Sequence, residues 1–223
     1  MRKTIVYLAT ITLMILTCTA CNSEENSQTN TDNIDNNEAS PDPAYKVVLD
    51  PGHGGEDVGA IGASGQYEKD FTLALSLKVK ELLESEENIE VYMTREDDSH
   101  ISQESRYRPK FANEINADLF VSIHGNTFQD SSVSGTETFY YNKSSKSFAK
   151  IIHKHLAEAT GFRDRGVKRE EFFVVKETNM PAVLLEIGYL TNPHEESVML
   201  TDEFQYKVAS AIVDGIKEYK TAS

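Results

Sequence analysis

Short apolar runs alternate with longer amphipathic stretches along the chain from about residue 45 onward. The runs are rich in β-branched and aromatic residues, a composition that favours strands. We expect strands at residues 45–50, 89–94, 117–123, 135–141, 172–176 and 182–187. Between most of them apolar residues recur every three or four positions, which predicts helices at 68–83, 102–116, 145–160 and 202–219.

Strands that alternate with helices are typical of an α/β fold, in which helices cover both faces of a sheet. We therefore expect one three-layer domain over residues 45–223, built on a mostly parallel or mixed sheet of about six strands. A segment of this length can bury a sizeable core. Ligands of such folds bind at the carboxyl ends of the strands, so polar residues that directly follow a strand are the first candidates for a site.

The N-terminal segment has a different character. Two basic residues precede an apolar run from Ile5 to Leu16, which is the layout of a secretory signal. The run is shorter than the roughly 20 apolar residues that a membrane-spanning helix needs. We interpret residues 1–20 as a lipoprotein-type signal peptide, because small Ala20 precedes a cysteine, Cys21, that a lipid could modify. A permanent membrane anchor and ordinary cleavage near Ala20 with release of the protein are the alternatives.

The next segment, residues 21–44, is rich in Asn, Ser, Thr, Asp and Glu, which excludes a packed core and predicts a disordered polar linker. Flexible segments of this length have a root-mean-square reach of about 25–30 Å. A lipid on Cys21 would therefore hold the domain near the outer face of the cytoplasmic membrane. The chain contains only two cysteines, Cys18 and Cys21, and both precede the domain, so disulfides cannot stabilise it.

The charge balance narrows the choice of partners. The formal net charge is −14 and the sequence pI is about 4.8. This argues against nucleic acid as a partner and against electrostatic adhesion to anionic lipids or polymers. We expect contact with a membrane only through the lipid on Cys21, and we expect a monomer.

Two histidines stand where ligands are expected to bind. His53 follows the first strand in LDPGHGG, and His124 follows another strand in SIHGN. Imidazole nitrogens suit zinc, and a catalytic zinc takes a third protein ligand and keeps one open position. Glu68 at the start of a helix is placed to be that ligand, although the helix dipole also favours a carboxylate there. Glu186 ends the apolar strand PAVLLEI, where a carboxylate is costly unless it has a partner or a task.

Several separated blocks together resemble one protein family. They are LDPGHGG, the later Glu68, the pattern TRxxD at residues 94–98, Ala112-Asn113, ADLFVSIHGN and PAVLLEIGYLTN. In this order, from about Lys46 to the C-terminus, they resemble the zinc-dependent N-acetylmuramoyl-L-alanine amidases of the third amidase family. The resemblance implies a phosphorylase/hydrolase-like fold, Zn²⁺ bound by His53, Glu68 and His124, and Glu186 as the catalytic carboxylate.

The implied reaction is hydrolysis of the amide between N-acetylmuramic acid and L-alanine in peptidoglycan, with the protein exported to the membrane surface or into the cell wall. A zinc peptidase that cuts within the stem peptide and a non-catalytic wall-binding lipoprotein are the alternatives. Some members of the family carry an inhibitory helix after the second histidine block, and the interval from Asn126 to Gly161 is too short for one. Asp50 either orients His53 or ends a strand, and we interpret Arg95 and Arg106 as internal ion-pair partners.

Overall fold

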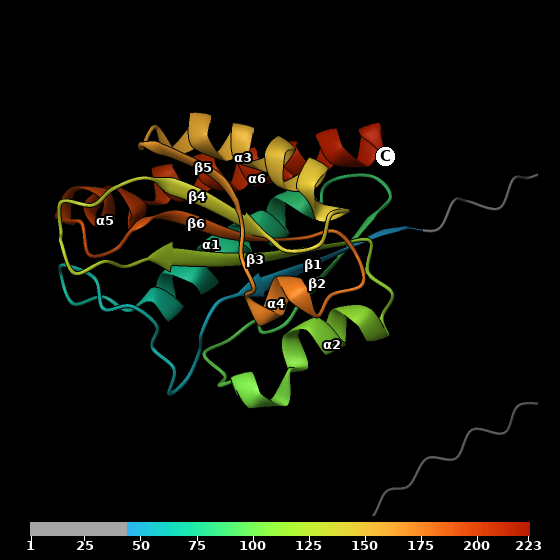
Figure 1. Cartoon of the computed structure of the whole chain (residues 1–223), viewed down its shortest axis with the longest axis horizontal. Helices are drawn as coiled ribbons and strands as arrows, with labels where there is room; N and C mark the ends of the chain where they lie inside the picture. Colours follow the sequence, from blue (N-terminus) through green and yellow to red (C-terminus); the bar gives the residue numbers. More distant parts are fainter. Residues whose placement is uncertain (1–43) are drawn as a thin grey trace, which may run out of the picture. The chain divides into compact units, whose positions relative to one another are not determined.

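Six strands form one mixed sheet in the computed structural model, which describes residues 44–223 (Figure 1). The strands are β1 (Tyr45–Pro51), β2 (Ile89–Met93), β3 (Leu119–Asn126), β4 (Thr136–Tyr140), β5 (Asp164–Arg169) and β6 (Ala182–Tyr189), in the spatial order β2-β1-β3-β6-β4-β5. The first three strands and β6 run parallel, whereas β4 is antiparallel to β6 and carries β5 parallel to itself. The ends of β1, β3 and β6 therefore meet the beginnings of β4 and β5 at one edge.

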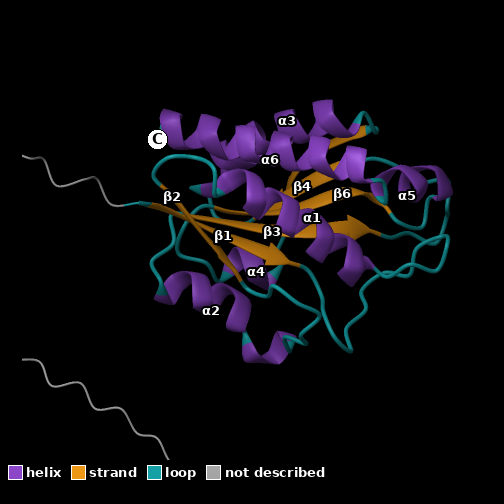
Figure 2. Ribbon diagram, turned by 180° about the vertical axis from the view of Figure 1, so that it is seen from behind, coloured by secondary structure: helices purple, strands orange, loops and turns teal. Residues whose placement is uncertain are grey.

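Helices cover both faces of this sheet (Figure 2). They are α1 (Glu68–Leu83), α2 (Tyr107–Glu114), α3 (Ser145–Thr160), α4 (Phe173–Lys176), α5 (Pro193–Met199) and α6 (Asp202–Ala222), with a 3₁₀ turn at Gln103–Ser105. Side chains of α1, α3 and α6 pack on one face in the larger apolar cluster, and those of α2 and α4 pack on the other. The predicted single three-layer α/β domain is confirmed.

Close packing in the larger cluster depends on a glycine where α3 meets α6. A Cβ added at Gly215 of α6 would lie 2.9 Å from the Cα of Ile152 in α3. No ordinary side chain fits at that distance, so the two helix backbones approach more closely than a pair of bulky residues would allow.

The secondary structure predicted from the sequence is correct for most elements, and α1 and α3 have the predicted bounds. One predicted strand is wrong: residues 173–176 form the one-turn helix α4. The run FFVV has high β-propensity, but Val174 and Val175 are adjacent and both buried in the smaller cluster, a burial pattern that a strand with alternating faces does not give.

Strand β5 was not predicted, because its sequence, DRGVKR, is mostly charged. It lies at the edge of the sheet, where charged side chains reach solvent and discourage pairing with another chain. Helix α5 was also missed, although Asn192 caps it and Pro193 opens it. The predicted helix 102–116 is divided at Arg106, whose φ of 54° is left-handed.

The predicted signal peptide, the lipid on Cys21 and nearly all of the linker lie outside residues 44–223 and stay predictions. Within the described residues no helix has the length and apolar composition needed to cross a membrane.

A buried ion pair fixes the end of β1. Arg108 donates to Asp50 Oδ1 at 2.5 Å, and Thr94 and Ser122 donate to the same carboxylate at 2.6 and 2.7 Å. Burial alone would raise the pKa of Asp50, but the charge of Arg108 and the two hydroxyl hydrogen bonds outweigh it and lower the pKa. The carboxylate form is therefore the form that stabilises the fold.

Replacing Asp50 with asparagine is expected to lower the free energy of unfolding at neutral pH by about 3–5 kcal/mol, because Arg108 would stay buried without its counter-charge. Since the folded pKa is depressed, this stabilisation is complete above about pH 4 and is lost as the pH falls through the folded pKa. Denaturant titration at several pH values tests this, with Glu84→Gln in the exposed Lys80 ion pair as the matched control. Equal losses in the two variants would contradict it.

Candidate metal centre and active-site groove

His53 lies in the loop that leaves the end of β1. Its backbone φ is 61°, a left-handed conformation uncommon for a residue with a side chain. Nδ1 of the ring lies 2.9 Å from Asp57 Oδ1, and Nε2 lies 3.1 Å from Glu68 Oε2. The contact with Asp57 fixes the orientation of the ring and leaves Nε2 facing Glu68.

His124 approaches the same carboxylate from the end of β3. Its Nδ1 lies 2.9 Å from Glu68 Oε1, and its ring centroid lies 5.1 Å from that of His53 at an interplanar angle of 82°. The ring occupies space that Gly52 leaves free, because a Cβ at position 52 would stand 2.3 Å from His124 Cε1. A glycine at position 52 is therefore a steric requirement of this histidine.

Glu68 is the first residue of α1, and only 4% of its surface is exposed. Its two oxygens accept hydrogen bonds from the backbone N–H groups of Ala60, at 2.8 Å, and Gly125, at 3.1 Å. Burial would raise the pKa of this carboxyl, but hydrogen bonds and charge from His124 and His53 lower it well below its usual range. The group is held as an anion between two imidazoles.

These three residues fit a divalent metal. One ligand atom from each lies within 4.8 Å of the others, and a carboxylate oxygen with two imidazole nitrogens is a donor set that zinc prefers. His124 contacts Oε1 of Glu68 at 2.9 Å and His53 contacts Oε2 at 3.1 Å, so the carboxylate presents one oxygen to each ring. The pairing of Asp57 with the other nitrogen of His53 is the usual support of a metal-binding histidine.

Glu186 stands beside these residues on the neighbouring strand. In the sheet it pairs with His124 of β3 on one side and with Glu137 of β4 on the other. Its Oε2 is buried and has no hydrogen-bond partner among the described residues. Burial, and then the charges of Glu68 and Glu137, raise the pKa of Glu186 well above its ordinary value. An unpartnered buried carboxylate is costly, and such a group beside a metal site is a candidate for proton transfer.

Two hollows meet at these residues. The first has a volume of about 340 Å³ and extends under α4, where Phe172, Val174 and Leu184 make one wall. The second is a more open hollow along the end of β3, bordered by Asn126 and Thr127. His53, Asp57, His124 and Glu186 line both, so a bond placed at the metal centre has room for a substituent on each side.

The structure thus brings together all four residues singled out from the sequence, and it adds three that sequence reasoning missed. Asp57, not Asp50, contacts His53, and Arg108 neutralises Asp50. Glu137 lies next to Glu186 and had no signal beyond its place in a predicted strand. The contact between His53 and Asp57 could have been suspected from the sequence, because the two residues are four positions apart in one Gly-rich loop.

The prediction that both arginines are internal ion-pair partners is wrong for Arg95, and Arg106 forms its ion pair at the surface. Buried Arg95 donates to the backbone oxygens of Pro51, Gly52 and Lys69 and pairs with no carboxylate among the described residues. Exposed Arg106 lies 3.6 Å from a carboxylate oxygen of Glu177. Residues 126–161 contain one helix, α3, and the connection from β3 to β4 contains none.

A family model described as N-acetylmuramoyl-L-alanine amidase matches residues 47–218, most of the chain and all four site residues. This chain belongs to the N-acetylmuramoyl-L-alanine amidase family. The solved catalytic domain of CwlV, an N-acetylmuramoyl-L-alanine amidase from Bacillus (Paenibacillus) polymyxa var. colistinus, is 46% identical with a TM-score of 0.77, over 80% of this chain and 99% of that domain.

Two relatives known by sequence extend the comparison of this amidase-family chain. YqiI, an uncharacterized protein of Bacillus subtilis (strain 168), is 42% identical over 81% of the chain and 87% of its own length. The probable cell wall amidase LytH of Staphylococcus epidermidis (strain ATCC 12228 / FDA PCI 1200) is 35% identical over 78% of the chain. The match spans only 57% of LytH.

Proposed function

We propose that this protein hydrolyses the amide bond between N-acetylmuramic acid and L-alanine in peptidoglycan, with a zinc ion as cofactor. The observation that carries the proposal is the convergence of three metal-binding side chains beside an unpartnered carboxylate, on a domain of the amidase family. The two hollows that meet there give space to a glycan on one side of the amide and a peptide on the other.

In this proposal Nε2 of His53, Nδ1 of His124 and an oxygen of Glu68 would hold the metal. When bound, zinc supplies Lewis-acid polarisation of the amide carbonyl and lowers the pKa of a water molecule. The protein contributes the fixed positions of these ligands, since Asp57 orients His53, and two backbone N–H groups orient Glu68. Such supporting contacts strengthen a metal site and fix its ligand geometry.

Glu186 is the proposed proton carrier. Its buried carboxylate has a raised pKa, which suits a group that must accept a proton from water near neutral pH and then give it to the departing amine. No hydrogen bond from another described residue occupies its Oε2, so this oxygen stays free for the proton. The protonated form would deliver the proton to the nitrogen of L-alanine as the bond breaks.

Digestion of purified peptidoglycan tests the reaction. The native protein, the chelator-treated protein and the zinc-restored protein are compared, and mass spectrometry identifies each newly formed amine. We expect a free N-terminal L-alanine that appears only with zinc. A free amine on a later residue of the stem peptide would indicate a peptidase, and no zinc-dependent product would indicate a binding protein.

The substrate places the proposed action outside the cytoplasmic membrane, in the cell wall. A lipid on Cys21 would tether the domain there, a proposal that rests on the sequence alone. Incorporation of a labelled fatty acid into the native chain, and its loss in Cys21→Ala, tests the anchor.

A further inference from the structure

A polar strip leads from the metal centre across the sheet toward β5. His124, Glu186 and Glu137 occupy paired positions on three neighbouring strands, and residues paired in this way point to the same face. The strip continues on β5, where Arg165 and Lys168 both contact the carboxylate of Glu137. It lies on the face of the sheet that α4 covers.

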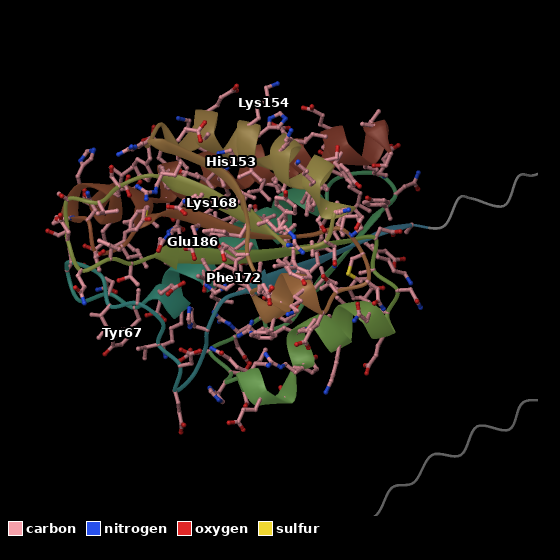
Figure 3. The ribbon with its side chains drawn as sticks, in the orientation of Figure 1. Tyr67, His153, Lys154, Lys168, Phe172 and Glu186 are labelled. Atoms are coloured by element: carbon pink, nitrogen blue, oxygen red, sulfur yellow. The ribbon has the colours of Figure 1, made fainter. Side chains whose placement is uncertain are left out.

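Lys168 is the most accessible charged group of this strip. Its Nζ lies 2.8 Å from Glu137 Oε2, yet 41% of its side chain is exposed. It also lies 5.9 Å from the ring centroid of Phe139, which contacts Phe172 at the wall of the enclosed hollow. Figure 3 labels Lys168 of β5, Glu186 of β6 and Phe172, which precedes α4. Lys168 does not line the hollow itself, so its ammonium group lies behind the wall that Phe172 makes, where a substituent of the scissile amide that extends out of the hollow would meet it.

Two cationic side chains, Arg165 and Lys168, contact the single carboxylate of Glu137, so one positive charge is in excess there. The other oxygen of this carboxylate, Oε1, accepts hydrogen bonds from Arg165 and from the hydroxyl of Tyr189. Glu137 thus keeps two donors on Oε1 when Lys168 turns away. Glu137 is the one described acceptor of the Lys168 ammonium, which has three N–H donors. Two donors and much of one positive charge remain for a ligand.

The distance also fits a peptide substituent. Glu186 and Lys168 stand on strands separated by β4, and Lys168 pairs two residues further along β4 than Glu186 does, so their backbones lie about 12 Å apart. An extended peptide advances about 3.3–3.6 Å per residue, so groups on the second or third residue lie about 7–11 Å from the scissile bond. The stem peptide is the part of peptidoglycan that carries free carboxylates. The lactyl carboxyl of the glycan is consumed in the amide itself.

We propose that Lys168 binds a carboxylate of the stem peptide and gives the enzyme a preference for acidic over amidated stems. The inference rests on the proposed function. It directs the peptide along the strip toward β5 and leaves the open hollow beside Asn126 to the glycan. Glu137 acts as a positioning residue that holds the ammonium at the groove.

Two synthetic muramyl peptides test the preference. They differ only in whether the residue after L-alanine carries a free carboxylate or a carboxamide. We expect the native enzyme to cleave the acidic substrate with a kcat/KM roughly threefold to tenfold higher, chiefly through a lower KM, because the contact is charged but partly screened by solvent. The preference should decrease as salt is added.

Lys168→Met removes the charge and keeps an unbranched side chain, so it should lower kcat/KM for the acidic peptide to the level of the amidated one. Lys168→Arg should restore the preference, and Lys154→Met, on the outer surface of α3 in Figure 3, should leave it unchanged. Equal losses on both substrates, or no preference in the native enzyme, would overturn the inference while leaving the amidase reaction intact. Failure to cleave either substrate at the lactyl amide would instead contradict the proposed function.

Discussion

Glu186→Gln is expected to lower kcat by about 10²–10⁴-fold, the usual contribution of a positioned general acid–base group, while the protein keeps its zinc. Glutamine has the size of glutamate but cannot accept and return a proton at neutral pH. The variant should be no less stable than the native protein, because Oε2 of the replaced carboxylate is buried and makes no hydrogen bond within the described structure. Assays on peptidoglycan, metal analysis and thermal unfolding provide the three measurements.

Glu158→Gln is the matched control, an exposed glutamate on α3, across the sheet from α4. It makes the same chemical change away from the site and should leave all three measurements unchanged. Full activity of Glu186→Gln with zinc bound would remove Glu186 from the reaction. A large loss of stability would show that the carboxylate has a structural partner.

Glu68→Gln is expected to abolish both zinc binding and activity, with bound metal falling from about one ion per chain to nearly none. A neutral amide is a poor substitute for a carboxylate between two histidines, and its NH₂ group would face the imidazole nitrogens. Glu68→Gln should lose as much activity as the native protein loses on treatment with chelator, because both lack the same ion. Metal analysis after gel filtration gives the stoichiometry.

Thermal unfolding separates loss of metal from loss of fold. A ligand present at 1,000 times its Kd stabilises the folded state by about 4 kcal/mol, so chelator should lower the Tm of the native protein. Chelator should not change the Tm of Glu68→Gln. Asp70→Asn, an exposed acidic residue in the same first turn of α1, should behave like the native protein. A chelator-sensitive Tm in Glu68→Gln would mean that the metal is bound elsewhere.

Most of the fold was readable from the sequence because its central strands and long helices have strong periodicity. Strand β5 was missed, and helix α4 was mistaken for a strand. In both, tertiary contacts override the local preference of the sequence. DRGVKR forms a strand because an edge exposes its charges, and FFVV forms a helical turn because two adjacent valines are buried together. Neither condition is visible in a window of a few residues.

The candidate ligands could be chosen from the sequence because each follows a strand or opens a helix. The residues that contact and support these ligands could not be chosen in the same way. Asp57 meets His53 only through the left-handed turn of the loop, and Glu137 becomes a neighbour of Glu186 because β4 runs against β6. Strand direction and loop conformation depend on the whole domain, so these partners were accessible only after folding.

The direction of β4 also determines where an insertion in the chain would lie beside the active site. Since β3 ends and β4 begins at the same edge, residues 127–135 leave and re-enter the sheet above the histidines. Residues added to that connection would lie next to the open hollow that Asn126 and Thr127 border, outside the strand pairs. An insertion between α1 and β2 would instead emerge at the opposite end of the strands, away from the histidines.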